Sequence, residues 1–367
     1  MTLALKELLR ARLRFGLLAA AISLLVFLLL FLNTLSQTLL GSFTAAVENN
    51  SADVLVYAGD ARRNLQASRL DPTVVDEVAG VEGVEAAAGL AEVTLTADVG
   101  EGLTDLSLWG FTPGQPGEPG EVVEGRMPGD GEALVDIADA AAGFTIGRTI
   151  TLEPSGRTLE IVGHSRDSRF NVSATAYTTL EEWQAVAGAA NPQAPVVPVN
   201  LVAVRGGGAD AAGLAATITG EVAGVEALDR AAAAAALPGV EQISQSFTLL
   251  VGITFAIVVL VVGFFFLILT VQKLRTFVAL RALGARTSYL AGAVILQIAV
   301  LVLVGVALAT ALLAVAAVTS SEAFPLRVDP LLVAAVLGAV LVCSVAAGLV
   351  SVRRIAGLDP SSVAQIR

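Results

Sequence analysis

Residues 247–271 read FTLLVGITFAIVVLVVGFFFLILTV, and this stretch decides the class of the protein. It contains no charged side chain, and about 20 residues at a rise of 1.5 Å each are enough to cross the hydrocarbon core of a bilayer. Three further stretches are equally long and also lack charge. The sequence therefore predicts four transmembrane helices, at residues 15–40, 246–272, 289–318 and 330–352.

The composition of the whole chain agrees with a membrane protein. Of 367 residues, 55% are hydrophobic and 15% are charged, and a soluble chain of this size is usually richer in charge. The first apolar stretch follows a basic leader, but its run at 15–32 exceeds the h-region of an ordinary signal peptide, so we expect it to stay as a membrane span. The single Cys343 and single His164 exclude a disulfide framework and cysteine- or histidine-clustered metal sites.

The arginines and lysines predict the orientation. Eleven of them lie in residues 1–14, 273–288 and 353–367, together with two acidic residues. By the positive-inside rule we expect these three segments in the cytoplasm. Residues 41–246 instead carry 10 arginines and 29 acidic residues, and a loop of this length crosses largely regardless of its charge. We expect residues 41–245 to form an extracytoplasmic domain and 319–329 a short external loop. The net charge of −11 argues against a nucleic-acid partner.

The long loop reads as an α+β domain. The pentapeptide VAGVE occurs at 78–82 and again at 222–226, each time where a helical pattern, at 72–78 or 210–222, gives way to a strand-like one. We interpret these as two similar α/β units. Strand-like runs at 90–99, 105–111, 132–135, 149–152 and 158–163 predict a small β-subdomain inserted between them. Residues 191–198 read as an extended connector, and 231–236 as a helix. The second transmembrane helix is expected to begin near Val240, as a stalk.

Residues 272–286, QKLRTFVALRALGAR, predict a helical extension of the second span into the cytoplasm. No glycine or proline interrupts them before Gly284, which suits a helix C-cap. Phe277, Leu280 and Leu283 give this turn an apolar face among arginines. One interpretation is a helix on the membrane surface; the other is a knob that inserts into a groove of a cytoplasmic partner.

Two motifs resemble those of the MacB/FtsX-like permease family of ABC transporters. The sequence LRALGA at 280–285 is similar to the coupling-helix signature of that family, and RRIAGLDPSSV at 353–363 is similar to its closing motif. Short strings further resemble the HrtB and DevC types of haem-exporter permease. They are LALKEL at 3–8 with Arg14-Phe15, TVQK at 270–273, IVG at 161–163, FNV at 170–172 and Ala176-Tyr177.

The resemblance implies the fold, the partners and the coupling residues. It implies an α-helical protein of the inner or plasma membrane, with four transmembrane helices and an α+β, MacB-like extracytoplasmic domain built from two porter-like units and an inserted β-subdomain. A permease homodimer, in contact with membrane lipid, pairs with cytoplasmic ABC ATPase subunits of the MacB/LolD type, which push on the turn. The residues expected to couple are Phe277, Leu280, Arg281, Leu283, Gly284 and Ala285.

The chain itself is expected to be non-catalytic and to bind no cofactor. A Walker A loop needs a lysine directly after a glycine, and the only lysines, Lys6 and Lys273, do not follow one. ATP and Mg²⁺ are therefore expected on the partner ATPase. No serine or cysteine nucleophile is placed with the single histidine.

Polar residues near the ends of the first two spans are candidates for a cargo path: Asn33, Ser36, Gln37, Gln245 and Thr248. Alternatively, they form hydrogen bonds between helices. The leading functional hypothesis is extrusion of a hydrophobic or amphiphilic molecule, with haem as one candidate. The alternative is an FtsX-like subunit that transmits force to an external cell-wall hydrolase and moves no cargo. If the cargo is haem, the options for an iron ligand are Glu48, Tyr57, Met127, His164, Tyr177 and Glu241.

Overall fold

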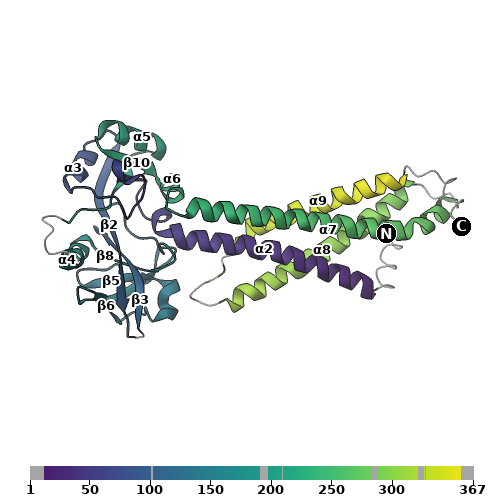
Figure 1. The fold of residues 1–367 in the computed structure, drawn as a ribbon, viewed down its shortest axis with the longest axis horizontal. Helices are drawn as coiled ribbons and strands as arrows, with labels where there is room; N and C mark the ends of the chain where they lie inside the picture. The colour runs from purple at the N-terminus through teal and green to yellow at the C-terminus, as the bar shows by residue number, and fades with distance from the viewer. Residues whose placement is uncertain are drawn as a thin grey trace. The chain divides into compact units, whose positions relative to one another are not determined.

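The computed structural model describes residues 12–100, 102–190, 197–208, 210–282, 287–320, 326 and 328–356. The chain divides into two compact units, drawn in Figure 1. The helical unit comprises Met1–Ser36, Ser246–Ser320 and Leu326–Arg367, and the α+β unit comprises Gln37–Gln245 with Ser321–Pro325.

The helical unit is built from four long helices, α2 (Arg12–Glu48), α7 (Val240–Ala282), α8 (Thr287–Thr319) and α9 (Pro330–Ala356). Three stretches are long and apolar enough to cross a membrane: Phe15–Glu48, Val240–Ile268 and Ile295–Thr319. Within the described part of α9, the apolar stretch is shorter, Val333–Ser344. Two of the helices belong to both units, because the last turns of α2 and the first turns of α7 are counted with the α+β unit.

The core of the helical unit is a seam of apolar side chains from all four helices. On α2 the buried positions alternate in steps of three and four, Phe15, Ala19, Ile22, Val26 and Leu29, which is the spacing of a coiled-coil-like seam. The other helices contribute Val258, Val262, Phe266, Leu301, Val302, Ala309, Leu313, Val333 and Val340. Since no basic or acidic residue interrupts these positions, the core suits a lipid environment.

The described residues of the α+β unit form one ten-stranded sheet, in which nine strands follow one path and β6 lies off it. Their order is β10-β1-β9-β2-β3-β8-β5-β7-β4, and β6 pairs with β2 and β7. The strands are β1 (Val54–Ala58), β2 (Val84–Asp98), β3 (Leu103–Phe111), β4 (Val122–Gly125), β5 (Glu132–Asp136), β6 (Thr149–Glu153), β7 (Arg157–Ser165), β8 (Ala174–Thr179), β9 (Leu201–Gly206) and β10 (Val225–Asp229).

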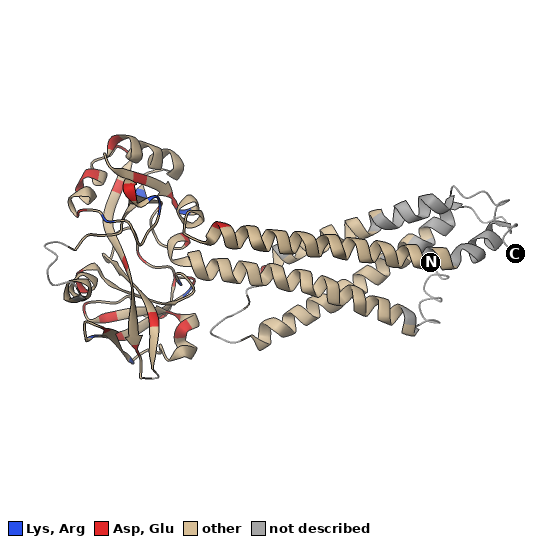
Figure 2. Ribbon diagram, viewed as in Figure 1, with Lys and Arg blue, Asp and Glu red and all other residues tan. Residues whose placement is uncertain are grey.

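Short helices complete this unit: η1 (Gly59–Ala61), α3 (Thr73–Ala79), η2 (Ile137–Ala142), α4 (Leu180–Ala190), α5 (Ala211–Glu221) and α6 (Arg230–Ala235). Strand β2 serves two parts of the sheet. Its first half, from Val84 to Leu90, pairs with β9, and its second half, from Ala91 to Asp98, pairs with β3. The porter-like part and the β-subdomain are therefore joined by one strand. Figure 2 shows the acidic residues spread over the strands and short helices of this unit.

The two predicted helix-to-strand units are present, but the register assigned to the repeat is wrong. The strands begin at Val84 and Val225, and each follows a glycine with positive φ, Gly83 (+91°) and Gly224 (+79°). Residues 80–85 read GVEGVE, and the first GVE forms the turn after α3, with Gly80 at a φ of −80°. The matching segments are thus 83–85 and 224–226, because only glycine adopts this left-handed turn without steric cost.

All five predicted strands of the β-subdomain are found, and sequence reasoning missed β1, β4, β8 and β9. The helix predicted at 231–236 is α6, whose N-terminus is capped by Asp229 accepting from the Ala232 N–H at 2.9 Å. Helix α7 begins at Val240, as predicted for the stalk. Most of the connector predicted at 191–198 lies outside the described residues.

Candidate coupling site

The predicted coupling residues lie at the C-terminal end of α7. This helix runs unbroken over 43 residues, which corresponds to about 65 Å. Phe277, Leu280 and Arg281 belong to it, and their side chains are not among those described; Leu283, Gly284 and Ala285 lie outside the described residues. The continuous rod that the sequence predicted is confirmed as far as Ala282, and the coupling role of these residues stays a prediction.

The five residues of the predicted cargo path lie on two helices. On α2, Ser36 is buried, Asn33 is half-buried and Gln37 is exposed. On α7, Gln245 and Thr248 are both exposed. The Gln245 amide donates to Glu241 Oε1 at 2.9 Å, so its hydrogen bond is made one turn back on the same helix. Their role as a cargo path stays a prediction.

Sequence reasoning missed other polar side chains that are buried in the helical unit. Gln297 of α8 is 6% exposed, Ser344 of α9 is 1% exposed and Ser23 of α2 is 3% exposed. Thr254 of α7 is satisfied by its own helix, since its hydroxyl donates to the Leu250 carbonyl oxygen at 2.7 Å. The sequence could not predict that these residues are buried, because a single polar residue in an apolar run does not show which face of the helix it occupies.

The best-defined polar site of the chain lies where the end of α2 meets residues 166–173, here called the clamp loop. Four hydrogen bonds join the two segments. Asn49 Nδ2 donates to the Asp167 carbonyl oxygen at 2.9 Å. The remaining three are between main-chain atoms: Ala46 N to Arg169 O at 3.0 Å, Asn171 N to Phe43 O at 3.2 Å, and Val172 N to Ser42 O at 3.0 Å.

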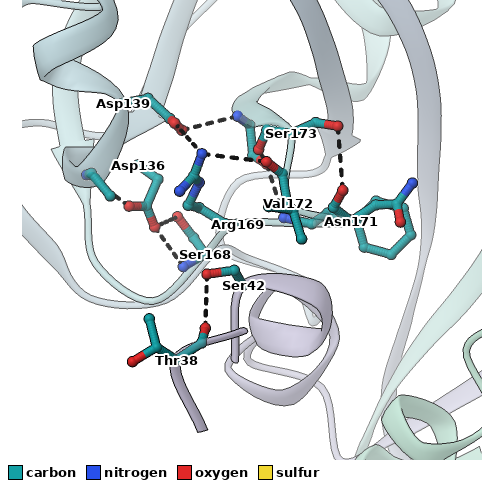
Figure 3. Close-up of polar contacts among 12 residues, drawn as sticks. Thr38, Ser42, Asp136, Asp139, Ser168, Arg169, Asn171, Val172 and Ser173 are labelled. Atoms are coloured by element: carbon teal, nitrogen blue, oxygen red, sulfur yellow. Dashed lines mark hydrogen bonds and ion pairs between the residues drawn. The ribbon is translucent and has the colours of Figure 1, made fainter. Parts of the chain in front are cut away.

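These bonds place the clamp loop antiparallel to the last two turns of α2, since the loop residues rise from 167 to 172 while their partners fall from 49 to 42. The N–H of Ala46 and the carbonyl oxygen of Ser42 each bond to the loop. The Ser42 hydroxyl also donates to the Thr38 carbonyl oxygen at 2.9 Å, an arrangement that often bends a helix. The loop and the helix end thus share hydrogen bonds. Figure 3 shows the Ser42–Thr38 bond and the contacts of Ser168 and Arg169 with Asp136 and Asp139.

The backbone of the clamp loop is strained. Asp167, Asn171 and Val172 have φ values of +56°, +53° and +61°. Asparagine and aspartate tolerate this region, but a β-branched valine there is an outlier that costs on the order of 1–3 kcal/mol. The surrounding contacts therefore hold the loop in a conformation that it would not adopt alone.

One anchor of the clamp loop is Asp136, the last residue of β5. Its Oδ2 accepts from the N–H of Ser168 at 2.8 Å and from the Ser168 hydroxyl at 3.0 Å, and its Oδ1 accepts from the N–H of Ala138 at 2.9 Å. Tyr177 of β8 donates its hydroxyl to the Ser168 carbonyl oxygen at 2.6 Å. Burial raises the pKa of Tyr177 well above its usual range, so the phenol stays a donor. Ser168 is therefore fixed from two strands.

The second anchor is the ion pair of Asp139 and Arg169. Arg169 Nη2 lies 2.9 Å from Asp139 Oδ1, and Asp139 Oδ2 accepts from the N–H of Thr175 at 3.2 Å. Asp139 is only 2% exposed, and this burial raises its pKa to about 7. Arg169 opposes the shift and nearby Asp136 adds to it. Desolvation outweighs the ion pair, as it does for many buried charges.

His164 of β7 is occupied on both ring nitrogens. Nε2 lies 2.8 Å from the Phe144 carbonyl oxygen, and Nδ1 lies 3.3 Å from Glu124 Oε2. The ring is 4% exposed. The first contact requires a proton on Nε2, because a carbonyl oxygen can only accept. The single histidine of the chain is therefore a structural residue of the β-subdomain.

Aromatic packing fills the space beneath the clamp loop. Phe170 meets Trp109 edge to face with ring centroids 5.2 Å apart, and Trp109 stacks on Tyr177 at 6.1 Å. Phe170 belongs to the same apolar cluster as Ala46 and Val47 of α2. Rigid rings and main-chain bonds thus join α2 to β3 and β8. Such a site can transmit a change of position between these elements. The described residues hold no group of three or more His, Cys, Asp or Glu side chains arranged for a metal ion.

These features define a membrane protein with several apolar helices, two of which continue into an α+β unit. Residues 248–360 match the family described as FtsX-like permease C-terminal. The matched region contains the described part of α8 and α9, most of α7, the motif at 280–285 and residues 353–360 of the closing motif. This part of the chain is thus similar to the C-terminal region of FtsX-like permeases, which are non-catalytic transmembrane subunits of ABC transporters.

Two solved structures are similar to about half of the chain. One is the extracellular domain of the noncanonic ABC-type transporter YknZ from Gram-positive bacteria, at 16% identity and a TM-score of 0.35, covering 48% of this chain and 99% of that one. The other is the periplasmic region of MacB from Actinobacillus actinomycetemcomitans, at 11% identity and a TM-score of 0.37, covering 50% of this chain and 91% of that one. The similarity to permeases rests on the match at residues 248–360.

Proposed function

We propose that this chain is the permease subunit of an ABC exporter that extrudes a hydrophobic or amphiphilic molecule by mechanotransmission. The observation that carries the proposal is the unbroken helix α7, which begins at Val240 in the α+β unit and continues to Ala282 in the arginine-rich turn. A push on that turn by the partner ATPase moves the whole helix, because an α-helix resists bending over a few turns. The partner is an ATPase of the MacB/LolD type, which holds ATP and Mg²⁺, and the working unit is a permease homodimer.

The charge distribution supports an extracytoplasmic α+β unit. Its acidic residues far outnumber its arginines, whereas the turn after α7 and the segment after α9 are basic, as the positive-inside rule expects of cytoplasmic segments. The apolar side chains exposed on α7, among them Leu249, Ile253, Leu260 and Phe264, suit contact with lipid or with a second copy of the chain.

The surroundings of the six candidate iron ligands favour none of them as a haem ligand. The proposed cargo is therefore the broader class of hydrophobic or amphiphilic molecules. Tyr57 and Tyr177 are fully buried, both ring nitrogens of His164 are engaged, and Glu241 accepts from Gln245. Met127 packs against an apolar cluster. Glu48 is exposed, but a single exposed carboxylate does not by itself make a haem site.

The alternative is force transmission to an external cell-wall hydrolase without transport. One observation favours force transmission. The clamp loop bonds the end of α2 to the β-subdomain, and a helix that acts as a lever on an outside partner needs such an attachment. Both functions use the same long helices, α2 and α7, and differ in what the moving α+β unit acts on.

Reconstitution separates the two functions. The full chain is placed in proteoliposomes with an ABC ATPase of the MacB/LolD type, and ATP-driven release of fluorescent lipid or haem is measured, along with activation of a secreted cell-wall peptidase. Export predicts ATP-dependent release that is lost in the Gly284→Pro variant and kept in Gly284→Ala. Activation of the peptidase without any release would overturn the export proposal in favour of the alternative.

A further inference from the structure

We infer that Arg230 is a positioning residue that ties the end of helix α2 to helix α6, the short helix that leads into α7. The tie keeps the two long helices at a fixed spacing where they join the α+β unit, so that a movement of α7 is passed on to α2. The inference deepens the proposed function and rests on it only for its consequence in transport.

The C-terminal end of α2 has no cation of its own. The helix ends at Glu48 and has no basic residue in its last turn. The last four carbonyl groups of an α-helix have no partner within the helix, and they form the negative end of its dipole. A basic side chain can satisfy such carbonyl groups. A guanidinium that reaches this end from another segment is therefore stabilising.

Arg230, the first residue of α6, supplies this guanidinium. Its Nη1 donates to the Asn50 carbonyl oxygen at 2.9 Å and, more weakly, to the Glu48 carbonyl oxygen at 3.5 Å. Asn50 is buried, and its side-chain amide in turn donates to the carbonyl oxygens of Ala46 and Val47 at 3.3 Å and 2.7 Å. Arg230 thus binds the residue that caps α2, and a hydrogen bond from a charged donor is stronger than one between neutral groups.

The backbone of Arg230 is fixed by the sheet. It follows Asp229, the last residue of β10, which pairs with Val54 at the start of β1. Asp229 also caps α6 by accepting from the N–H of Ala232 at 2.9 Å. Because β1 begins a few residues after α2 ends, the Arg230 side chain closes a small ring that runs from α2 through β1 and β10 and back to α2. This ring restricts the angle between the end of α2 and the sheet.

Helix α6 is joined closely to α7. A turn of four residues, 236–239, separates them (Figure 1), and it is held by main-chain bonds from Leu237 N to Ala234 O at 3.3 Å and from Val240 N to Leu237 O at 3.2 Å. These three residues are buried in the same apolar cluster as Ala46 of α2. The end of α2 and the start of α7 therefore pack on one core, and the guanidinium adds a charged tie between them.

Distances between spin labels test the tie directly. The full chain in lipid nanodiscs carries labels at Gly41→Cys on α2 and Glu241→Cys on α7, in a Cys343→Ser background and diluted with unlabelled chain. A Cβ at Gly41 meets no atom within 4 Å, and Glu241 is exposed, so both labels suit the fold. With Arg230 in place we expect one narrow distance distribution, because the tie holds the two helices at one spacing.

Two substitutions of Arg230 give opposite expectations. Arg230→Gln removes the charge and shortens the side chain, so the distance distribution should become broad. Arg230→Lys should keep it narrow, because both contacts of Arg230 use a single nitrogen and an ammonium group can take its place. A narrow distribution in Arg230→Gln, or a broad one in Arg230→Lys, overturns the inference. The first result would show that Arg230 caps α2 without fixing its spacing to α7.

Hydrogen exchange on the same samples measures how firmly the tie holds. In Arg230→Gln the opening of a peptide covering residues 42–50 should rise at least about tenfold, the effect of losing a hydrogen bond from a charged group. Strand β3 should keep its protection, which shows that the variant is folded. Arg157→Gln removes the ion pair with Glu182 elsewhere in the same unit and should leave residues 42–50 unchanged. Equal opening in wild type and Arg230→Gln contradicts the tie.

The functional consequence is measured separately. In proteoliposomes with an ABC ATPase of the MacB/LolD type, Arg230→Gln should keep the stimulated hydrolysis of ATP but lower the ATP-driven release per ATP hydrolysed, and Arg230→Lys should restore it. Equal loss of hydrolysis and release contradicts a role in transmission. Since spacing and exchange are measured without ATPase or cargo, a failure of the tie leaves the proposed function standing. A wild type without any ATP-driven release contradicts the proposed function and leaves the spacing result valid.

Discussion

Val172 donates its main-chain N–H to the carbonyl oxygen of Ser42 at 3.0 Å, although the φ of Val172 is +61°. One residue thus combines backbone strain with a direct bond to helix α2. The strain is maintained by the Asp136 and Asp139 anchors on either side of the loop, because valine alone would leave this region of φ. The end of a membrane-crossing helix is therefore held by a loop whose own conformation depends on buried carboxylates.

Asp136→Asn should destabilise the α+β unit. The amide has one acceptor oxygen where the carboxylate has two, so it cannot accept from both Ser168 and the N–H of Ala138 and leaves a buried donor without a partner, at a cost of about 1–3 kcal/mol. Chemical denaturation of the full chain in detergent, followed by tryptophan fluorescence, measures the change, since Trp109 lies within this cluster. The matched control is Asp105→Asn, at an exposed position of β3. An equal loss in both variants would contradict the anchoring role of Asp136.

Val172→Asn should stabilise the closed clamp loop. Asparagine adopts positive φ more readily than a β-branched residue, and the main-chain bond to Ser42 is unaffected by the side chain. We expect a gain of roughly 0.5–1 kcal/mol in the free energy of unfolding, seen as a higher unfolding midpoint. Val93→Asn serves as the comparison, because it places the same side chain on a strand with ordinary φ. A loss of stability at residue 172 would show that valine packing matters more than backbone strain.

The parts of the fold that could be predicted from the sequence are those set by residues close together in the chain. The apolar spans, the stalk at Val240 and the strands with alternating side chains are visible in local patterns. Strand β1 was missed because VLVYA is buried along its whole length, and a short continuous apolar run does not distinguish a buried strand from a helix. The clamp loop joins residues 42–49 to 136–139 and 166–175, and no local pattern in the sequence indicates that these segments meet. The one part of the loop that the sequence singled out is Phe170-Asn171-Val172, which resembles a string of the HrtB and DevC types of permease.

Gly110→Ala should disrupt the packing of α4 on β3. A Cβ at Gly110 would lie 2.4 Å from Trp183 Cβ and 2.7 Å from Trp183 Cγ, so the helix must shift away from the strand. Overpacking of this kind costs about 1–3 kcal/mol. Gly220→Ala in α5 meets no atom within 4 Å and should instead stabilise its helix by up to about 1 kcal/mol. Unfolding midpoints of the two variants moving in the same direction would contradict this account.

Gly305→Leu should separate α8 from α2 within the helical unit. A Cβ at Gly305 would lie 2.7 Å from Ile22 Cγ2, which shows that glycine allows the two helices to approach closely, as small residues do in membranes. We expect normal insertion but a lower thermal midpoint in detergent. Gly338→Leu in α9 meets nothing within 4 Å among the described residues and is the matched control. Equal midpoints for wild type and Gly305→Leu would show that this contact contributes nothing.

Gly284→Pro and Leu283→Asp should uncouple the chain from the proposed ATPase while leaving it inserted in the membrane. Both residues belong to the motif at 280–285 and lie beyond the described end of α7. Proline removes a backbone donor and fixes φ, and aspartate places a charge on the apolar face expected to contact the partner. Gly284→Ala keeps the backbone N–H and Leu283→Met keeps an apolar side chain, so both variants should retain stimulation of the proposed ATPase. Stimulated hydrolysis and ATP-driven output are measured on the same proteoliposomes. Coupled output at the wild-type level in Gly284→Pro and Leu283→Asp would show that the turn is not where the ATPase acts.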